Sequence, residues 1–448
     1  MSLAGPANTM PTLGLSMIAK NEAANIAPCL TSVKNVVSQI VIADTGSTDD
    51  TIAIARGLGA TVIEFAWTNH FGDARNAALR AMTTDWILSL DADEELDRNA
   101  VQAIPPLIRK PNVAGYILPV RNYTLAKEIR AGSSVGQAND LRHSRAAAAG
   151  SYFVYEKCRL FRRHSDIHFT GRIHEQVELT IRAAKLKLRP AALCIHNFGL
   201  LERGEDMGRK LAYYRDLLRL RAEEEPGDFR GWTYLGRMEY DSFNNRTEAL
   251  RNFQRALELN PGCVEALLFT AMIYLDLGRA QDAIPFLAFN PPDDSSTVQK
   301  HRLLGDAFCQ AGRLQEAQSA YRNALRLCER DPELESKLGL TEVRLGQTAE
   351  GLRRLERAAA VTPPRPVVQD RLMKAYVLLN MLPEAAAVAE SVAALAPHPK
   401  AFLRAASIHA QSRQWEQSAR LLRRGLDLFP NAPELQAAYS ESVALARS

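Results

Sequence analysis

Two aspartates that follow a short apolar segment could together bind a divalent cation. Residues 86–90 (WILSL) have the composition of a buried parallel strand, and Asp91 and Asp93 come directly after them. Carboxylates at positions i and i+2 at the end of a strand can converge on one hard cation. A cation held there would suit the binding of a diphosphate, because ligands bind where the strands of an α/β sheet end. An acidic turn before a helix that starts near Asp97 would explain the same residues. The segments upstream are therefore needed to distinguish a cation site from such a turn.

The segments before this acidic pair alternate between strand-like and helix-like patterns. The expected strands are 13–19, 39–43, 60–65 and 86–90, and the expected helices are 25–37, 71–82 and one that ends at 57–59. This alternation predicts right-handed βαβ units, and therefore an α/β domain with a mostly parallel sheet and helices on both faces.

Polar side chains follow three of the expected strands. Lys20 and Asn21 come after the first strand, Asp44 after the second and Asp91 after the fourth. Because ligands bind beyond the carboxyl ends of the strands in such sheets, we expect these side chains to meet at one edge. Asp44 could accept hydrogen bonds from a base N–H or a ribose hydroxyl, or it could instead cap the turn and helix that follow it.

Four segments taken together resemble the GT-A glycosyltransferases of the large inverting family 2. They are SMIAKNEAANIAPCLTSV, IADTGSTDDT, FGDARNAAL and LSLDADEEL, in this order between residues 13 and 96. The resemblance implies a GT-A fold with a Rossmann-like, mostly parallel sheet and an enzyme that uses a nucleoside-diphosphate sugar. No G-x-G-x-x-G turn follows a strand, which argues against a dinucleotide-binding domain. The first strand is followed by AKNEA instead of the glycine-rich phosphate loop of a nucleotidyltransferase.

The resemblance also implies roles for the matching residues. Asp44 would contact the nucleotide base. Arg75 would hold the nucleotide or its diphosphate, for which a guanidinium fork is suited, although it could also be an ordinary surface arginine. Asp91 would contact the ribose or a metal-bound water, and Asp93 would coordinate the metal. The pocket for the base and ribose would be lined by Lys20, Asn21 and Glu22.

The second half of the domain, with strands expected at 115–121 and 157–163, supplies a candidate general base. An inverting transfer needs a carboxylate that takes the proton from the attacking acceptor. The stretch GRIHEQV at 171–177 resembles the G-x-x-H-E segment of a family 2 subgroup, which makes Glu175 the candidate. His174 could orient Glu175, contact phosphate or replace it as the base. An exposed pair of strand residues is the alternative interpretation.

A histidine near the end of the domain could complete a metal site. The stretch IHNFG at 195–199 resembles the H-x-x-G form of the late histidine of GT-A enzymes, so His196 could join Asp91 and Asp93 around manganese or magnesium. The cation would act as a Lewis acid that stabilises the departing nucleoside diphosphate. A polar residue at the end of a strand, without a metal, would explain His196 equally well.

One segment of the domain lacks apolar residues that could anchor it. Residues 131–150 (AGSSVGQANDLRHSRAAAAG) are small and polar, which predicts a mobile loop. Such a loop could close over the sugar nucleotide or meet the acceptor, or it could be a plain insertion.

After about residue 200 the strand patterns end and a repeat of roughly 31–36 residues begins, which resembles the tetratricopeptide array. The first repeat carries Trp232, Leu235, Gly236, Ala249, Phe253, Ala256 and Pro261. About six units and a capping helix over 432–447 would form an all-α superhelix with a concave groove. The groove could bind a peptide or protein, or the array could form the interface of a homodimer. The expected division is 1–10 leader, 11–200 GT-A domain, 201–228 connecting helix and 229–448 repeat array.

Composition narrows the class of protein. The net charge of +4 and the absence of a basic aromatic platform give no indication of nucleic-acid binding. The six cysteines are scattered without a C-x-x-C pair, which is typical of reduced thiols in a cytoplasmic protein. No apolar stretch has the length of a membrane span, and the first ten residues lack the pattern of a secretory signal.

The resemblance to family 2, together with these patterns, implies a metal-dependent inverting glycosyltransferase. It would move a sugar from a UDP- or GDP-linked donor to a peptide, protein or glycan that the repeats recruit. The layout resembles glycosyltransferases that modify peptides, such as bacteriocin S-glycosyltransferases, and others that act on the lipopolysaccharide core. The alternative is a tetratricopeptide scaffold that carries an inactive transferase-like domain. The presence of the acidic pair, Arg75 and Glu175 favours the enzyme.

Overall fold

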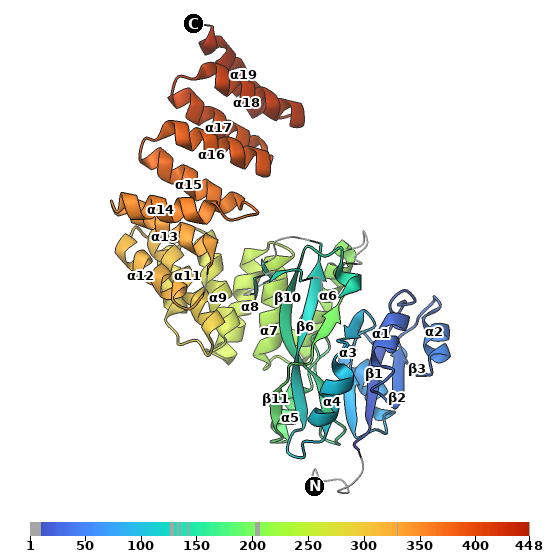
Figure 1. Cartoon of the computed structure of the whole chain (residues 1–448). Helices are drawn as coiled ribbons and strands as arrows, with labels where there is room; N and C mark the ends of the chain where they lie inside the picture. The colour runs from blue at the N-terminus through green and yellow to red at the C-terminus, as the bar shows by residue number, and fades with distance from the viewer. Residues whose placement is uncertain are drawn as a thin grey trace. The chain divides into compact units, whose positions relative to one another are not determined.

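The computed structural model describes residues 10–125, 130–131, 134–135, 137–140, 143–201, 207–328 and 330–447. The chain divides into two compact units, the first ending at Leu259 and the second beginning at Asn260. The first unit contains the main sheet and the helices up to α8, whereas the second is helical throughout its described residues (Figure 1). None of the described helices is both long and apolar enough to cross a membrane.

The first four strands form a parallel sheet, as the sequence predicts. They are β1 (Leu13–Ala19), β2 (Gln39–Asp44), β3 (Thr61–Glu64) and β4 (Trp86–Ser89), joined through α1 (Ile26–Val33), α2 (Thr51–Gly57) and α3 (Phe71–Arg80). Their order across the sheet is β3-β2-β1-β4. Ala19 pairs with Asp44, so the carboxyl ends of β1 and β2 lie level, and the polar residues that follow these strands meet at one edge.

The remaining strands make the sheet mixed. They are β5 (Glu94–Leu96), β6 (Gly115–Thr124), β9 (Gln137–Ala138), β10 (Ser151–Arg162), β11 (Leu188–Pro190) and β12 (Ile195–Asn197). Strand β10 runs antiparallel to both β4 and β6, and β12 runs antiparallel to β5. The described part of the chain between β6 and β10 contains no α-helix that could serve as a crossover, and without one two successive strands pair in antiparallel fashion. The expected parallel pairing holds for β1–β4 and for β11 and β12, which both run parallel to β6, whereas the pairs made by β10 and the pair β12–β5 are antiparallel.

Each face of the sheet is covered by helices. The buried side chains Leu15, Leu88 and Tyr116 face α1 and α4 (Ala100–Ile108). Ile87 and Phe161 point the other way, toward α3 and α5 (Glu178–Ala183). Neighbouring residues such as Ile87 and Leu88 serve opposite cores, because successive side chains of a strand point to opposite faces.

The second half of the chain consists of successive helices that pack against one another, as expected for tetratricopeptide repeats. In the first unit these are α7 (Phe229–Asp241) and α8 (Arg246–Leu259). In the second they are α9 (Val264–Asp276), α10 (Ala280–Ala283), α11 (Asp294–Gln310), α12 (Leu314–Leu325), α13 (Pro332–Arg344), α14 (Thr348–Ala359), α15 (Pro366–Leu378), α16 (Leu382–Leu395), α17 (Pro399–Gln411), α18 (Trp415–Leu428) and α19 (Pro433–Ala446). Small residues permit the close approach within a pair, since a Cβ on Gly339 would lie 2.9 Å from the carbonyl oxygen of Gly351.

Part of the segment expected to be a mobile loop is packed instead. Residues 132–133, 136 and 141–142 lie outside the described part of the chain, but 143–150 are described. Ala146 and Ala149 are buried in a small cluster with Tyr123 and Phe198. Arg145 donates to Glu95 Oε1 at 2.9 Å. These small alanines, which gave no sign of burial in the sequence, are thus packed against aromatic side chains.

Candidate active site

Asp91 lies at the centre of a row of charged side chains at the carboxyl end of β4. Arg159 Nη2 donates to Asp91 Oδ2 at 3.1 Å and to Glu94 Oε1 at 2.7 Å. Arg75 donates to the other oxygen of Asp91, so both carboxylate oxygens have a guanidinium partner. Burial would raise the pKa of Asp91, but Arg75 and Arg159 outweigh it and hold the pKa far below its usual value. Asp91 is therefore ionised and fixed in position.

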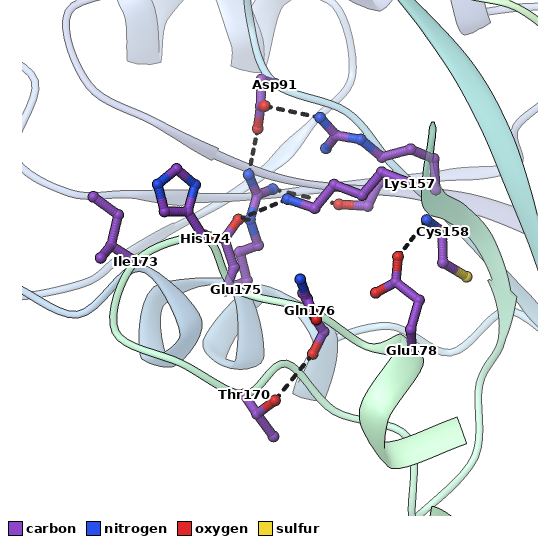
Figure 2. A network of polar contacts seen from close by, with 12 residues as sticks. Asp91, Lys157, Cys158, Thr170, Ile173, His174, Glu175, Gln176 and Glu178 are labelled. Carbon is purple, nitrogen blue, oxygen red and sulfur yellow. Dashed lines mark hydrogen bonds and ion pairs between the residues drawn. The ribbon is translucent and has the colours of Figure 1, made fainter. Parts of the chain in front are cut away.

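Arg75 connects Asp91 to the candidate general base. Its Nε donates to Glu175 Oε1 at 2.6 Å, and Lys157 Nζ lies 3.6 Å from the same oxygen (Figure 2). The charges thus alternate along the row, in the order Glu94, Arg159, Asp91, Arg75, Glu175, Lys157. Because Arg75 is almost fully buried, it is a structural part of this row, and the surface-arginine interpretation of Arg75 is wrong.

The ionisation of Glu175 is set by its two cationic neighbours. Burial would raise the pKa of Glu175, but the positive charges of Lys157 and Arg75 outweigh burial and lower this pKa to about 2. Glu175 is therefore a carboxylate at neutral pH, which is the state that a general base requires. The ion pairs reach Oε1, so Oε2 is the oxygen that remains for a further proton or ligand.

A β-bulge orients the two basic residues of β10. Cys158 pairs with Ile117 and Leu160 with Tyr116, so Arg159 is the extra residue between them. Glu178 Oε1 accepts a hydrogen bond from the Cys158 backbone N–H at 2.6 Å and thereby stabilises the bulge (Figure 2). Bulges re-aim side chains, and this one directs Arg159 toward Asp91 and Glu94. Glu178, the first residue of α5, contacts the bulge and does not belong to the row of charges.

Asp93 has the opposite electrostatic environment. No described cationic side chain forms an ion pair with its carboxylate. Burial, together with the negative charges of Asp91, Glu94 and Glu22, raises the pKa of Asp93 to about 8. The carboxylate packs against Gly199, on which a Cβ would overlap Oδ2. An acidic side chain among other acids, without a counter-charge, is the environment that a bound cation would stabilise.

The three-residue metal site expected from Asp91, Asp93 and His196 is not assembled. Among the described residues no group of three or more histidine, cysteine, aspartate or glutamate side chains is arranged to hold a metal ion. His196 Nδ1 lies 2.9 Å from the hydroxyl oxygen of Tyr123 and Nε2 lies 3.2 Å from Asp97 Oδ2. The reason is the strand pairing, which places His196 opposite Glu95 and so beside Asp97. Of the expected ligands, Asp93 alone keeps an environment that suits a cation.

The turn after β2 is closed by Asp44. Its Oδ2 accepts hydrogen bonds from the backbone N–H groups of Gly46 and Ser47, both at 3.0 Å, and its Oδ1 accepts from the Ser47 hydroxyl. These are the contacts of a turn-capping aspartate, which was the alternative interpretation. They also fix the Asp44 carboxylate at the strand end.

The loop after β1 is joined to the same turn. The backbone N–H of Asn21 donates to Ser47 Oγ at 3.0 Å, and that of Glu22 donates to Thr51 Oγ1 at 2.7 Å. Asn21 has a φ of 54°, a left-handed conformation that asparagine adopts more readily than most residues. Lys20, just before it, is exposed. The candidate base-and-ribose residues therefore lie together on two loops that brace each other.

The candidate base sits in a tight loop, and its histidine neighbour stays neutral. Thr170 and Gln176 exchange two backbone hydrogen bonds of 3.0 Å that close the loop. His174, inside it, has a left-handed φ of 54°. Desolvation by the surrounding protein, together with the positive charges of Lys157 and Arg221, outweighs Glu175 and lowers the pKa of His174 to about 4, although the residue is exposed. A neutral imidazole can contact a ligand but offers no positive charge to phosphate.

Two residues of the site, Lys157 and Glu94, were not singled out from the sequence. Arg159 is one of several basic residues before Glu175 that could favour a phosphorylated or acidic ligand, although a solvated strand face was the commoner explanation. Lys157 and Arg159 are two residues apart on β10, and this spacing is a signal for side chains on one face of a strand. The bulge and the partners of these residues could not be read from it. Glu94 is fully buried, although it stands in an acidic stretch that looks solvated.

Comparisons with known proteins fit this geometry. The family model described as Glycosyl transferase family 2 matches residues 15–169, and the model described as Tetratricopeptide repeat matches residues 239–292. A TPR repeat-containing protein of Synechococcus elongatus is 35% identical over 174 residues, which cover 39% of this chain and 37% of the relative. An uncharacterized glycosyltransferase of Rickettsia felis is 41% identical over 108 residues, covering 24% of this chain and 38% of the relative.

A third relative has a more specific name. The SPbeta prophage-derived glycosyltransferase SunS of Bacillus subtilis is 38% identical over 85 residues, which cover 18% of this chain and 20% of that protein. The chain thus spans well under half of the length of these curated relatives.

Proposed function

We propose that this chain, which combines a family 2 glycosyl transferase domain with tetratricopeptide repeats, transfers a sugar from a nucleoside-diphosphate donor to an acceptor. The observation that carries the proposal is the row Asp91–Arg75–Glu175, which joins the end of β4, helix α3 and the loop 171–176. These three residues come from distant parts of the sequence, and each is held in place by an oppositely charged partner. Preorganised charges of this kind are what a transfer of a phosphate-activated group requires.

The donor would bind across the ends of β1, β2 and β4. The loops that carry Lys20, Asn21, Glu22 and Asp44 would form the pocket for the base and ribose. Arg75 would provide positive charge near the diphosphate while Asp91 keeps its guanidinium oriented. A uracil or a guanine would fit the contacts equally well, because both offer N–H donors to a carboxylate.

Asp93 would hold a divalent cation, manganese or magnesium, through its carboxylate. When bound, such a cation would supply Lewis-acid stabilisation of the leaving nucleoside diphosphate. The fit rests on the raised pKa of Asp93, whose ionised form lacks a cationic partner among the described residues, and on Gly199, which leaves room for its carboxylate. A carboxylate is the type of ligand that both ions prefer.

Glu175 would accept the proton of the acceptor nucleophile. As the nucleophile attacks the anomeric carbon from the face opposite the leaving diphosphate, its proton would pass to Glu175 Oε2, and the configuration would invert. His174, being neutral, would donate or accept a hydrogen bond beside this point. The repeats would recruit the acceptor, for which a peptide or protein is the kind of ligand that tetratricopeptide grooves suit.

Slow hydrolysis of the donor tests the proposal without knowledge of the acceptor. Purified protein is incubated with UDP-glucose, UDP-N-acetylglucosamine or GDP-mannose, with manganese, magnesium or chelator, and the released nucleoside diphosphate is measured. We expect one nucleotide class to be hydrolysed in the presence of metal and to raise the melting temperature. Asp166→Asn, an exposed carboxylate at the far end of β10, is the control and should behave like wild type. If no donor is bound and no nucleoside diphosphate is released, the proposal is contradicted and an inactive domain on a scaffold is favoured.

Gly199→Ala is expected to lower turnover by roughly 10–100-fold, the usual size of an effect that disturbs the surroundings of a metal ligand. The added Cβ would overlap Asp93 Oδ2 and force this carboxylate to move. In manganese titrations of donor hydrolysis, half-maximal activity should need more manganese than in the wild type, whereas the KM for the donor should stay nearly unchanged. Gly208→Ala, at a position where a Cβ meets nothing within 4 Å, is the matched control. An unchanged metal requirement would remove Asp93 from the metal site.

A further inference from the structure

The loop that carries Glu175 is packed against helices that follow the sheet in sequence. Ile173 is buried in a cluster with Leu217 and Leu218 of α6 (Met207–Glu224) and Leu235 of α7. Both helices belong to the same compact unit as the sheet, which extends to Leu259. The first repeat is therefore part of the surroundings of the candidate active site.

We propose that Arg221 of α6 and Tyr234 of α7 are positioning residues that hold the Glu175 carboxylate in its productive place. The proposal rests on the proposed function, because it assumes that Glu175 is the general base. Both residues act through the backbone or through the neighbours of Glu175, which they contact directly.

Arg221 ties the backbone before Glu175 to the start of α7. Its side chain is 1% exposed, and Nη1 donates to the carbonyl oxygens of Ile173 and, at 3.4 Å, of His174. Its Nη2 donates to Asp228 Oδ2 at 2.9 Å, and Asp228 is the N-cap residue of α7. A buried arginine whose donors are shared between a carboxylate and two carbonyls fixes both partners, since losing either would leave a buried charge poorly paired.

Tyr234 contacts the residues on both sides of Glu175. Its hydroxyl oxygen accepts from Gln176 Nε2 at 3.0 Å, and the ring centroids of Tyr234 and His174 are 4.6 Å apart. The Arg221 guanidinium lies 5.6 Å from the centre of the Tyr234 ring. The backbone before Glu175 and the side chains of both its neighbours are thus held by two residues that also contact each other.

The loop needs such support because its backbone is unfavourable by itself. Gly171 and His174 both have left-handed φ angles, 93° and 54°, and the second is costly for a residue with a side chain. A Cβ on Gly171 would lie 2.8 Å from Arg221 Nη1, so the arginine fills the space beside the loop. Figure 2 shows Ile173 on the opposite side of Glu175 from Lys157, so one side of the loop faces the helices while the carboxylate faces the site.

The test compares Tyr234→Phe and Arg221→Gln with a control that breaks a different contact of α6. Among the described residues Arg219 forms ion pairs with Asp216 of α6 and, at 2.9 Å, with Glu239 of α7, and neither partner belongs to the loop. Arg219→Ala therefore removes an arginine from the same pair of helices. Donor hydrolysis is measured in the full chain and normalised to the number of donor-binding sites, and hydrogen exchange of 171–177 is followed by mass spectrometry.

We expect kcat to fall by about 10-fold in Tyr234→Phe and about 100-fold in Arg221→Gln, as for a displacement of about 1 Å in a reacting group. The KM for the donor should change little, because the donor contacts lie elsewhere. Exchange in 171–177 should be faster in both variants and unchanged in Arg219→Ala. A purely stabilising role would lower the fraction of active sites without lowering kcat per site.

Wild-type kcat per site together with wild-type exchange in Tyr234→Phe, which keeps the ring and its packing, would overturn the proposal even if Arg221→Gln fails to fold. Faster exchange of the loop with unchanged kcat would also overturn it, since the loop would then be held for a reason other than catalysis. Absence of turnover in the wild type would instead refute the proposed function. This result is distinct from the outcomes above, because it does not depend on either variant.

Discussion

Glu175→Gln is expected to reduce sugar transfer by roughly 10²–10⁴-fold, the usual range for loss of a general base. Glutamine has nearly the same shape but cannot take the acceptor proton. Binding of the nucleoside diphosphate should persist within a few-fold, because Arg75 keeps its ion pair with Asp91. The measurement is a transfer or hydrolysis assay beside a thermal-shift titration with the nucleotide, so that loss of chemistry is separated from loss of binding.

Glu156→Gln is the matched control, since Glu156 precedes Lys157 on β10 and is exposed to solvent. It should leave turnover unchanged. The pKa of Glu175 gives a second check. Because this pKa is held at about 2 by Lys157 and Arg75, the base stays ionised through the range of ordinary assays, and the wild-type profile should show no acidic limb near pH 4–5 from this group. Normal turnover in Glu175→Gln would assign the base to another residue.

Most of the first half of the sheet was predictable because its pattern is local. The strands β1, β2 and β4 are short apolar segments, and each has a polar residue at its end or shortly after it. Parallel strands place their carboxyl ends at one edge, so the meeting of Asp44 and Asp91 at that edge follows from topology. The approach of Arg75 to Asp91 follows from the position of α3 directly before β4.

The contacts that set the charges of the site could not be predicted, because they depend on long-range pairing. Arg159 reaches Asp91 only through the bulge in β10, which a hydrogen bond from the Cys158 backbone to Glu178 stabilises. His196 was expected near Asp93, yet the pairing of β12 with β5 directs its ring to Asp97. A shift of the strand pairing by one residue would turn each side chain to the other face, and nothing in the sequence fixes that register.

The boundary of the first compact unit could not be predicted from the sequence for a different reason. Composition changes near residue 200, where strand patterns end, but the packing of α6 and α7 onto the loop of Glu175 extends the unit to Leu259. Sequence composition reports the type of secondary structure and not which elements share a core. Ile173, an ordinary apolar residue between two polar ones, is the contact that connects the loop to these helices.

Asp93→Asn is expected to abolish metal-dependent turnover and, at the same time, to stabilise the metal-free protein. The loss of turnover follows if Asp93 is the carboxylate that holds the cation, because an amide binds a divalent cation far more weakly than a carboxylate does. Donor hydrolysis over a range of manganese concentrations measures it. Asp166→Asn, which removes an exposed carboxylate, should retain both turnover and metal response. Full activity in Asp93→Asn would take the metal role away from this residue.

The gain in stability follows from the raised pKa of the same carboxyl group. Burial and the charges of Asp91, Glu94 and Glu22 raise it to about 8 in the folded protein, against about 3.9 in an unfolded chain. Between these two values the folded state binds a proton that the unfolded state lacks, so folding becomes less favourable as the pH rises. Asparagine carries no such proton, so the melting temperature of Asp93→Asn should exceed that of wild type by more at pH 8.5 than at pH 5 when chelator is present. Saturating manganese should reduce this difference in melting temperature, because it stabilises the wild type alone. A difference that is equal at pH 5 and pH 8.5 would show that the charge of Asp93 is compensated within the protein itself.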